Sequence, residues 1–280
     1  MKFFNKNKYH LLKLKIEKRL KNMTQFNVIC FPALRSTQDT LKDFAAHGAN
    51  EGCVLIADSQ SGGRGREGRS FFSPSGSGIY MSFLLRPSVS APDLSPKKLV
   101  CVTSAAAVAV AESIEKVTGK KTGIKWVNDI LHNGLKVSGI LTEAAFNKDN
   151  TGYEYIVVGI GINLFENSFP SELQGIAGAL FSKKPLFLTR LKVKLISEIL
   201  NRFSVYYGLL ARDDLSFVEK YRLRSVVIGK RVDIIINDKV TDSGTVLALN
   251  DDFSLNVKTD NGKELFLSYG EVRIKINENQ

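Results

Sequence analysis

The middle of the chain holds one long helical pattern followed by three strand patterns in succession, and this order limits the fold more than any other feature. Residues 95–119 form the helical pattern, with Ser95 suited to the N-cap, Pro96 to the first helical position and Gly119 to the C-terminal stop. The strand patterns cover residues 122–133, 135–146 and 153–164, with Asn133-Gly134 as the turn between the first two. We therefore predict the α+β class, a mixed β-sheet with helices.

The segments on either side add further elements. Residues 28–48 have the pattern of a strand, a turn and a helix, with Ser36 or Thr37 as the N-cap and Gly48 as the stop. Two short apolar runs are predicted as strands, residues 52–60 and 79–87. Residues 188–210 are predicted as a helix capped by Thr189.

The sequence changes in character from about Val226. Short alternating strands follow one another, with turn signals at Asn237-Asp238, Asp251-Asp252 and Asn261-Gly262, which predicts a small antiparallel barrel of about fifty residues. We place a boundary near Arg224. The predicted organisation is an N-terminal extension (residues 1–25), a main domain (residues 26–224) and a C-terminal barrel domain (residues 225–280).

The formal charge of +11 suggests nucleic-acid binding until its distribution is considered. Residues 1–22 contain seven lysines, one arginine and one glutamate, so this extension holds +7 of the excess. It is compatible with a spurious upstream start before Met23, an organelle-targeting segment or a basic amphipathic helix that binds a surface weakly. We expect a disordered or untranslated extension.

Two further properties limit the class of protein. No window approaches the roughly 18 consecutive apolar residues of a membrane span, so a membrane protein is not expected. The three cysteines, Cys30, Cys53 and Cys101, lie far apart and form no CxxC pair, which favours buried reduced thiols over disulfides or a zinc site. Reduced thiols are typical of the cytoplasm, where we expect this protein.

Residues 62–75, GGRGREGRSFFSPS, lie between two predicted strands. Their G-x-G-x-x-G spacing does not open a helix, so a dinucleotide fingerprint is excluded, and no complete P-loop motif occurs elsewhere in the chain. Single-strand RNA binding is typical of repeated Arg-Gly boxes, whereas this box occurs once. The remaining interpretation is a loop whose glycines let the backbone approach an anion while its arginines bind the anion's oxygens.

Two other stretches have polar residues beside apolar strands. Lys125-Trp126-Val127-Asn128-Asp129 precedes Lys136, whose ammonium suits an activated carboxylate or a phosphate if it faces a pocket. Gly159 and Gly161 lie within one strand pattern, which indicates a bulge or a close approach of another part of the chain. Each stretch taken alone is compatible with ordinary packing.

Taken together and in this order, these motifs resemble the biotin protein ligases. The motifs are RSTQD at 35–39, SQSGGRGREGR at 59–69, FFSP at 71–74, KWVND at 125–129, KVSGILTE at 136–143 and GIGIN at 159–163. The resemblance covers the chain from about residue 26 to its end. It implies a catalytic domain like that of class II synthetases and a C-terminal SH3-like β-barrel.

The resemblance implies an enzyme that joins biotin to AMP from Mg²⁺-ATP and passes the biotinyl group to one lysine of a biotin carboxyl carrier protein of acetyl-CoA carboxylase or a related carboxylase. The implied catalytic residues are Lys136, Arg66 and Asp129. The implied biotin-binding residues are Ser36, Thr37, Gln38, Gln60, Arg64, Gly65, Arg66 and Lys136. The implied ATP and adenylate residues are Arg69, Phe71, Lys125, Trp126, Asn128 and Asn163, with Glu143 as a further residue on the nucleotide side.

Because positioning and electrostatics perform this chemistry, the resemblance requires neither a protein nucleophile nor a protein metal site. Three positions depart from the family pattern: Gln38 replaces Asn, Phe71 replaces Trp and Val127 replaces Pro. Phe71 keeps an apolar face over the ligand, and Val127 suits a strand.

Many bacterial members carry an N-terminal DNA-binding domain, and the roughly 25 residues before the catalytic domain are too few for one. We therefore expect no specific DNA binding and no membrane partner, and the resemblance allows a homodimer. Two alternatives remain: a lipoate ligase of the same fold and a basic RNA-binding protein that uses the Gly-Arg stretch.

Overall fold

The computed structural model describes residues 6–21, 26–91, 94, 98–149, 152–165, 169–268 and 272–276. Its larger sheet has seven strands: β1 (Asn27–Phe31), β2 (Cys53–Ala57), β3 (Gly78–Leu85), β4 (Gly123–Lys125), β5 (Asp129–His132), β6 (Leu135–Phe146) and β7 (Tyr153–Asn163). Their order is β1-β2-β3-β7-β6-β5-β4. Only β1 and β2 pair in parallel among the strand pairs of this sheet, so the predicted mixed sheet is confirmed.

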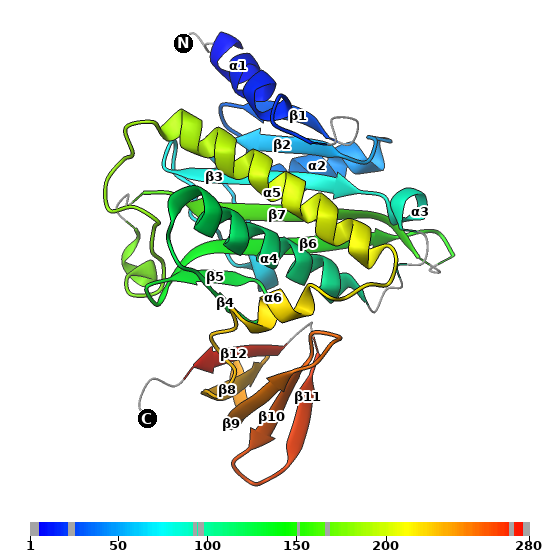
Figure 1. Ribbon diagram of the computed structural model, residues 1–280, viewed down its shortest axis with the longest axis vertical. Coiled ribbons are helices and arrows are strands. Elements are labelled where there is room, and N and C mark those ends of the chain that lie inside the picture. Colours follow the sequence, from blue (N-terminus) through cyan, green and yellow to red (C-terminus); the bar gives the residue numbers. More distant parts are fainter. Residues whose placement is uncertain are drawn as a thin grey trace.

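Helices cover both faces of this sheet. The helices are α2 (Thr37–Ala46), α3 (Pro87–Ser90), α4 (Leu99–Thr118), α5 (Leu188–Leu210) and α6 (Val218–Arg222), with short 3-10 turns at Arg66–Gly68 and Ser171–Leu173. Leu55 belongs to a small core cluster beneath α2, whereas its neighbours Val54 and Ile56 belong to the main core with α4 and α5. Because successive strand residues point to opposite faces, α2 lies on one face and the two long helices on the other (Figure 1).

The two long helices confirm the predicted elements but not their starts. Gly119 ends α4 in the left-handed region (φ 72°), as predicted. Lys98 is the N-cap of α4, so the helix begins later than expected, and the proposed cap at Ser95 and Pro96 lies outside the described residues. Phe187 is the N-cap of α5, and the prediction of Thr189 as the cap is wrong because Thr189 lies inside the first turn.

The turn that contains Trp126 and Val127 also differs from expectation. Residues 122–133 were predicted as one strand, but Trp126, Val127 and Asn128 form a turn between β4 and β5, with a cis peptide bond between the first two. The indole N–H of Trp126 donates to the Phe253 carbonyl at 2.8 Å. Contacts from distant parts of the chain thus hold apolar residues in a turn although their local pattern is that of a strand.

The C-terminal segment forms a second, antiparallel sheet. Its strands are β8 (Arg231–Ile236), β9 (Lys239–Leu249), β10 (Leu255–Thr259), β11 (Glu264–Leu267) and β12 (Val272–Ile276), in the order β11-β10-β9-β8-β12. Asn237 and Asn261 lie in the tight turns that the sequence predicted, and Asn237 and Asp238 both have positive φ angles. This sheet is consistent with the predicted small barrel.

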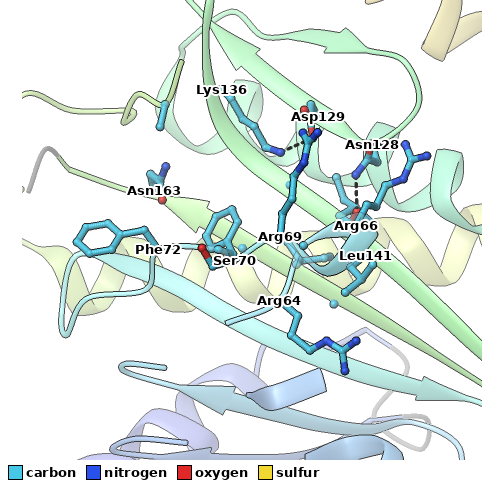
Figure 2. A pocket seen from close by; sticks show the side chains of 18 of the residues that line it. Arg64, Arg66, Arg69, Ser70, Phe72, Asn128, Asp129, Lys136, Leu141 and Asn163 are labelled. Carbon is cyan, nitrogen blue, oxygen red and sulfur yellow. Dashed lines mark hydrogen bonds and ion pairs between the residues drawn. The ribbon is translucent and has the colours of Figure 1, made fainter. Parts of the chain in front are cut away.

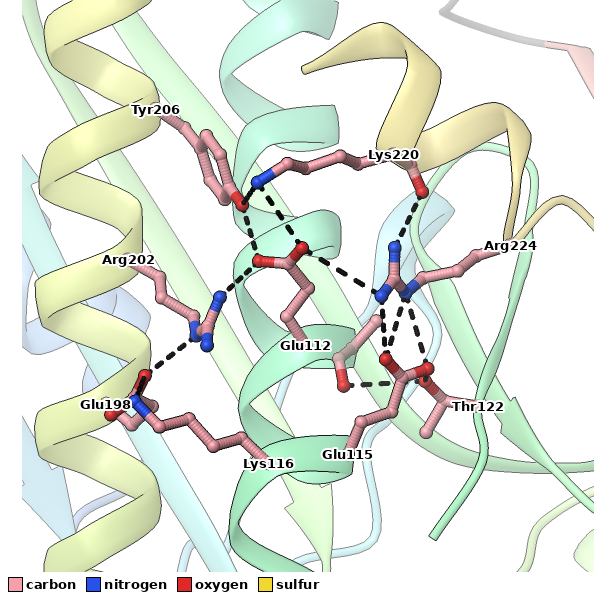
Figure 3. A network of polar contacts seen from close by, with 10 residues as sticks. Glu112, Glu115, Lys116, Thr122, Glu198, Arg202, Tyr206, Lys220 and Arg224 are labelled. Atoms are coloured by element: carbon pink, nitrogen blue, oxygen red, sulfur yellow. Dashed lines mark hydrogen bonds and ion pairs between the residues drawn. The ribbon is translucent and has the colours of Figure 1, made fainter. Parts of the chain in front are cut away.

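A polar network holds α4, α5 and α6 together (Figure 3). Glu112 of α4 accepts hydrogen bonds from Arg202 and Tyr206 of α5. Arg224, just after α6, donates to Glu115 at 2.7 Å and lies 3.9 Å from Glu112. Lys220 of α6 donates to Tyr206 of α5 at 2.9 Å, so the segment that leads into the second sheet is anchored to both long helices.

The prediction that the N-terminal extension is disordered is wrong for the residues that the structure describes. Residues Lys6–Glu17 form a helix, α1, whose Ile16 is completely buried in the main core, and Leu20 follows as a second buried residue. Glu17 accepts a hydrogen bond from the Val28 backbone N–H at 3.3 Å. The charged residues led to the prediction of disorder. The buried side chains of Ile16 and Leu20 nevertheless dock α1 on the main domain.

The three cysteines are free, with Cys53 and Cys101 buried and Cys30 half-buried. Burial raises the pKa of Cys101 to about 12, so this thiol stays protonated. No helix in the described part of the chain combines the length and the apolar character that a membrane span requires.

Candidate active site

A cavity of about 360 Å³ brings together every site residue that the sequence analysis named, with the exception of Glu143 (Figure 2). Its walls come from the start of α2, the Gly-Arg loop, the turn after β4, and the strands β6 and β7. This volume lies within the range of about 300–1,000 Å³ that is typical of small-molecule sites.

Buried polar side chains line one end of this cavity. The Thr37 backbone N–H donates to Gln60 Oε1 at 2.8 Å, and Gln60 Nε2 donates to Ser73 Oγ at 3.0 Å. The hydroxyl oxygens of Thr37 and Ser82 are 2.9 Å apart, and Ser82 donates to Gln38 Oε1 at 3.1 Å. These groups are neutral and fixed by one another, so this end suits a polar uncharged ring.

Gln38 is held on both sides. Its Nε2 donates to the Val157 carbonyl at 3.1 Å, and a Cβ atom at Gly159 would lie 2.4 Å from its Oε1. The glycine in β7 therefore makes room for the longer glutamine that this chain has in place of asparagine. Ser36, predicted as the N-cap, accepts from the Asp39 backbone N–H at 3.2 Å and starts α2 at this wall.

Two close approaches shape the Gly-Arg loop, one within the loop and one onto the sheet. A Cβ atom at Gly63 would lie 2.5 Å from the Phe71 carbonyl oxygen, and one at Gly161 would lie 2.5 Å from the Phe71 ring. The close approach predicted from the two glycines in β7 is therefore confirmed. Phe71 fills the space above Gly161 and meets Tyr80 edge-on, with ring centroids 6.4 Å apart.

Arg66 links the loop to the turn after β4. Its Nη1 donates to Asn128 Oδ1 at 3.2 Å, while Asn128 Nδ2 donates to the Ile140 carbonyl at 2.8 Å (Figure 2). Asn128 is buried, and the Arg66 side chain is 16% exposed. Asn128 thus orients a guanidinium over the cavity.

Lys136 and Asp129 face each other across the β5–β6 pair. Lys136 Nζ lies 2.6 Å from Asp129 Oδ1 (Figure 2). Lys125, on the neighbouring strand, has a pKa below its usual value because burial disfavours its charged form; Asp129 opposes this shift and the Lys136 charge adds to it. The Asp129 carboxylate thus interacts with two ammonium groups, so this end of the cavity has excess positive charge.

The two other arginines of the loop have acidic partners of their own. Arg64 Nη1 donates to Asp39 Oδ1 at 2.7 Å, and its guanidinium lies on the side of the loop away from Lys136 (Figure 2). Burial acts to raise the pKa of Asp39, but the hydrogen bond and charge of Arg64 outweigh it and lower that pKa. Arg69 is 59% exposed and lies 3.8 Å from Asp238 of the second sheet.

The expectation that Glu143 lies on the nucleotide side is wrong. Glu143 is absent from the cavity wall and pairs with Lys42 of α2 at 3.0 Å. It follows Gly139 and Leu141 on the same face of β6, and each step of two residues moves a side chain by roughly 6.6 Å along the strand. That spacing takes Glu143 beyond the end of the cavity.

The matching family model covers residues 30–163 and describes the biotin/lipoate A/B protein ligase family. A curated relative from Mycobacterium tuberculosis, biotin--[acetyl-CoA-carboxylase] ligase, is 31% identical over 201 residues, which cover 70% of this chain and 70% of the relative. This chain belongs to the biotin/lipoate A/B protein ligase family.

Other members of this family match over different lengths. The bifunctional ligase/repressor BirA of Bacillus subtilis is 43% identical over 154 residues, which are 55% of this chain, and the match spans about half (46%) of the relative's length. The biotin protein ligase from Aquifex aeolicus, solved in complex with biotin and ATP, is 26% identical with a TM-score of 0.73 and covers 90% of this chain and 99% of that chain. The family fold thus extends over nearly the whole chain.

Several residues of this family member line the cavity although they were not predicted as site residues. Within the family motifs these are Glu67, Phe72, Ile140, Leu141 and Ile160. Outside them they are Ser70, Met81, Ser82, Phe169, Leu173, Ile176, Ala177 and Ile274. Asn163 Nδ2 donates to the Gly178 carbonyl at 3.0 Å and so fixes the segment that brings Ile176 and Ala177 to the wall. For Ser82, its place as a polar residue within the apolar run 79–87 is a local signal.

The described residues include no group of three or more His, Cys, Asp or Glu side chains that could hold a metal ion. Asp129 and Glu67 are the carboxylates of the described cavity wall. Mg²⁺ is commonly bound through substrate phosphates with one or two protein carboxylates. The cavity therefore fits a magnesium ion that enters with a nucleotide better than a resident metal ion.

Proposed function

We propose that this protein is a biotin protein ligase. It binds biotin and Mg²⁺-ATP, forms biotinyl-5′-AMP with release of pyrophosphate, and transfers the biotinyl group to a lysine of a biotin carboxyl carrier domain. Residues 26–224 supply the catalytic domain and residues 225–280 a barrel domain that contributes Ile274 to the cavity wall. The reduced cysteines and the use of ATP agree with a cytoplasmic enzyme.

One observation carries the proposal: a single cavity has a neutral, hydrogen-bonding end and a cationic end. The neutral end, around Thr37, Gln60 and Ser82, suits the ureido ring of biotin, which both donates and accepts hydrogen bonds. The cationic end, around Lys136 and Lys125, suits a carboxylate brought next to phosphates. A ligand with those two ends is an acyl-adenylate of biotin.

In the first step, a carboxylate oxygen of biotin attacks the α-phosphorus of ATP, and the bond from that phosphorus to the pyrophosphate oxygen breaks. Two anions approach one another, so cations at fixed positions lower the barrier without a protein nucleophile. Lys136, held by Asp129, lies at the carboxylate, and Arg66, held by Asn128, lies over the phosphate.

In the second step, the amine of an acceptor lysine attacks the acyl carbonyl of the adenylate, AMP leaves and the amine loses a proton. The name of the Mycobacterium tuberculosis relative supports the acetyl-CoA carboxylase subunit as the acceptor. Arg69 lines the cavity with a side chain that is 59% exposed, and we infer that the carrier domain approaches the cavity past it.

The test is a transfer assay with a biotin carboxyl carrier domain, Mg²⁺-ATP and either biotin or lipoate, read by intact mass. The proposal predicts a single biotinyl addition that requires ATP and disappears when the acceptor lysine is replaced by arginine. Lipoyl addition at a comparable rate would favour the lipoate ligase alternative. Saturable RNA binding with no transfer of either acid would favour the RNA-binding alternative.

A further inference from the structure

A second, larger cavity lies on the opposite face of the seven-stranded sheet from the candidate active site. Its volume is about 970 Å³, and it is bounded by α1, by the first residues of α5 and by the ends of β1, β2 and β3. Figure 1 shows α1 and the start of α5 near the β1 edge of this sheet. No residue that the structure describes lines both cavities.

The cavity is a groove that is closed at one end. Asn201 of α5 accepts a hydrogen bond from the Lys21 backbone N–H at 2.9 Å and donates to the Arg19 carbonyl at 3.0 Å. The α5 residues that line the groove end at Ile196, before this junction. The two helices are thus tied together beyond one end of the groove and leave it open toward the start of α5.

The floor of the groove is apolar. It reaches the sheet between the two helices at Cys30, Ile56 and Ile79, of which Cys30 is half-buried and the isoleucines are buried. Its walls include the partly buried Leu12 and Leu188. The α1 and α5 helices already occupy the layer above the sheet, so a third helix of about 10–12 Å diameter does not fit between them. A single alkyl chain is thinner than a helix and can lie on the apolar lining of the groove.

The rim of the groove is strongly cationic. Its basic residues are Lys8, Lys15, Lys18, Arg19, Lys184, Arg190 and Lys192. Among the described residues that line the groove, Asp58 is the one carboxylate, and it accepts from Lys192 Nζ at 3.2 Å and from Ser75 Oγ at 3.0 Å. A single acid thus faces seven basic side chains.

Burial lowers the pKa of Lys192, Asp58 opposes that shift, and the charges of Lys8 and Lys184 lower the pKa further. These three ammonium groups therefore repel one another near the open end of the groove, and an added anion there would relieve the repulsion.

We propose that this groove is a binding site for an anionic single-chain amphiphile, an alkyl chain that ends in a carboxylate or a phosphate. The chain lies along Leu12, Cys30 and Leu188, and the anionic head meets Lys8 and Lys184 at the open end. Because the ligand contacts both α1 and α5, its binding stabilises the docking of α1 on the main domain. This site is independent of the ligase activity.

The experiment is calorimetric titration of the full-length protein with dodecanoate and with dodecyl phosphate, both below their micelle concentrations. Either ligand should bind saturably with one site per chain and raise the melting temperature. Hexanoate should bind at least roughly ten-fold more weakly than dodecanoate because it buries less apolar surface. Binding of only one of the two dodecyl ligands would support the site and identify its head group.

Charge-reversal variants test whether the cations at the open end bind the anionic head of the ligand. The double variant K8E/K184E should weaken binding of dodecanoate by at least roughly ten-fold, since both cations that meet the head are reversed. K148E/K263E makes the same change in charge at exposed positions outside the groove and should bind as the wild type does. Both double variants should keep biotin-dependent adenylation, which also shows that they are folded.

Four results would overturn the proposal: no saturable binding of either ligand, equal binding of uncharged dodecanol, equal binding by K8E/K184E, or binding only to anionic phospholipid vesicles. The last result would assign the basic rim to a membrane surface. None of these results bears on the transfer of biotin, so failure here leaves the proposed ligase activity standing.

Discussion

The indole N–H of Trp126 donates to the carbonyl of Phe253 at 2.8 Å, and this buried hydrogen bond joins residues 127 positions apart in the chain. A second buried bond, from the Tyr221 hydroxyl to the Val127 carbonyl at 3.1 Å, holds the same turn. The turn continues into Asn128 and Asp129, which orient the arginine and the lysine of the candidate site. The second sheet and α6 therefore support the turn on which the cationic end of the cavity depends.

Replacing Trp126 with Phe should lower both stability and adenylation. The variant leaves the buried Phe253 carbonyl without its donor, which costs about 1–3 kcal/mol of unfolding free energy. We expect kcat/KM for pyrophosphate release to decrease along with it, because Asn128 and Asp129 move with the turn. Urea unfolding and initial rates measure the two effects, and Trp126→Phe with unchanged rates would show that the turn needs no support from Phe253.

Replacing Lys136 with Ala should decrease kcat/KM for adenylate formation by roughly 10²–10³-fold, the range for losing one preorganised charge. The fold should remain intact, since the Lys136 side chain is 32% exposed and its backbone bonds persist. Circular dichroism checks the fold and pyrophosphate release checks the step. Near wild-type release would exclude Lys136 from the reaction.

Replacing Arg66 with Gly should let the adenylate escape. The loop loses its bond to Asn128, so biotinyl-AMP should diffuse away and label lysines of an unrelated protein such as albumin. Asn128→Ala, which removes the acceptor of the same bond, should increase bystander labelling in the same direction. If both variants label only the carrier domain, retention of the adenylate does not depend on this contact.

Replacing Gly161 with Ala should weaken biotin binding through the loop. The added Cβ would lie 2.5 Å from the Phe71 ring, so the ring and the loop that follows it must shift. Gly152→Ala is the matched control, because its Cβ would meet no atom closer than 3.7 Å. Calorimetry with biotin should show a decrease in affinity for Gly161→Ala alone, and equal affinities would remove Phe71 from the binding wall.

Acidification should destabilise the network of α4, α5 and α6 (Figure 3). Burial acts to raise the pKa of Glu112, Glu115 and Glu198, but hydrogen bonds and nearby cations lower each pKa below its usual value of 4.5. The Tyr206 hydroxyl donates to Glu112, Arg224 donates to Glu115 and Lys116 donates to Glu198. A lowered folded-state pKa stabilises the protein above the unfolded value, and this stability is lost as the pH decreases through the folded value. Unfolding free energy should therefore fall below about pH 4.5.

The Glu112→Gln variant checks the source of this pH dependence. It keeps the shape of the side chain while removing its charge, so the unfolding free energy at pH 7 should decrease by about 1–3 kcal/mol. Its unfolding free energy should also change less between pH 6 and pH 3.5 than that of the wild type. A slope identical to the wild type's would place the acid sensitivity elsewhere.

Local patterns predicted much of this site. The hydroxyl of Ser36 caps α2 as expected, and Gly159 and Gly161 allow the close approaches that their spacing indicated. These features depend on the backbone within a few residues, where capping and glycine rules apply. The family resemblance supplied the named site residues, and the fold places them around one cavity.

The remaining features depend on distant contacts. Trp126 and Val127 have the local pattern of a strand, yet Phe253 and Tyr221 hold them in a turn. Ile274 reaches the cavity from the second sheet without any motif around it. Burial of Ile16 docks α1, although the many lysines of the extension dominate its composition. Tertiary contacts override local preference at these positions.

The account's central claim is that this cavity activates biotin as an acyl-adenylate with Lys136 at the carboxylate. Exchange of labelled pyrophosphate into ATP, measured without any acceptor protein, tests that step alone. We predict exchange that requires biotin and Mg²⁺, that lipoate does not support, and that Lys136→Ala reduces by roughly 10²-fold or more. Exchange that is independent of biotin, or equal with lipoate, would contradict the claim.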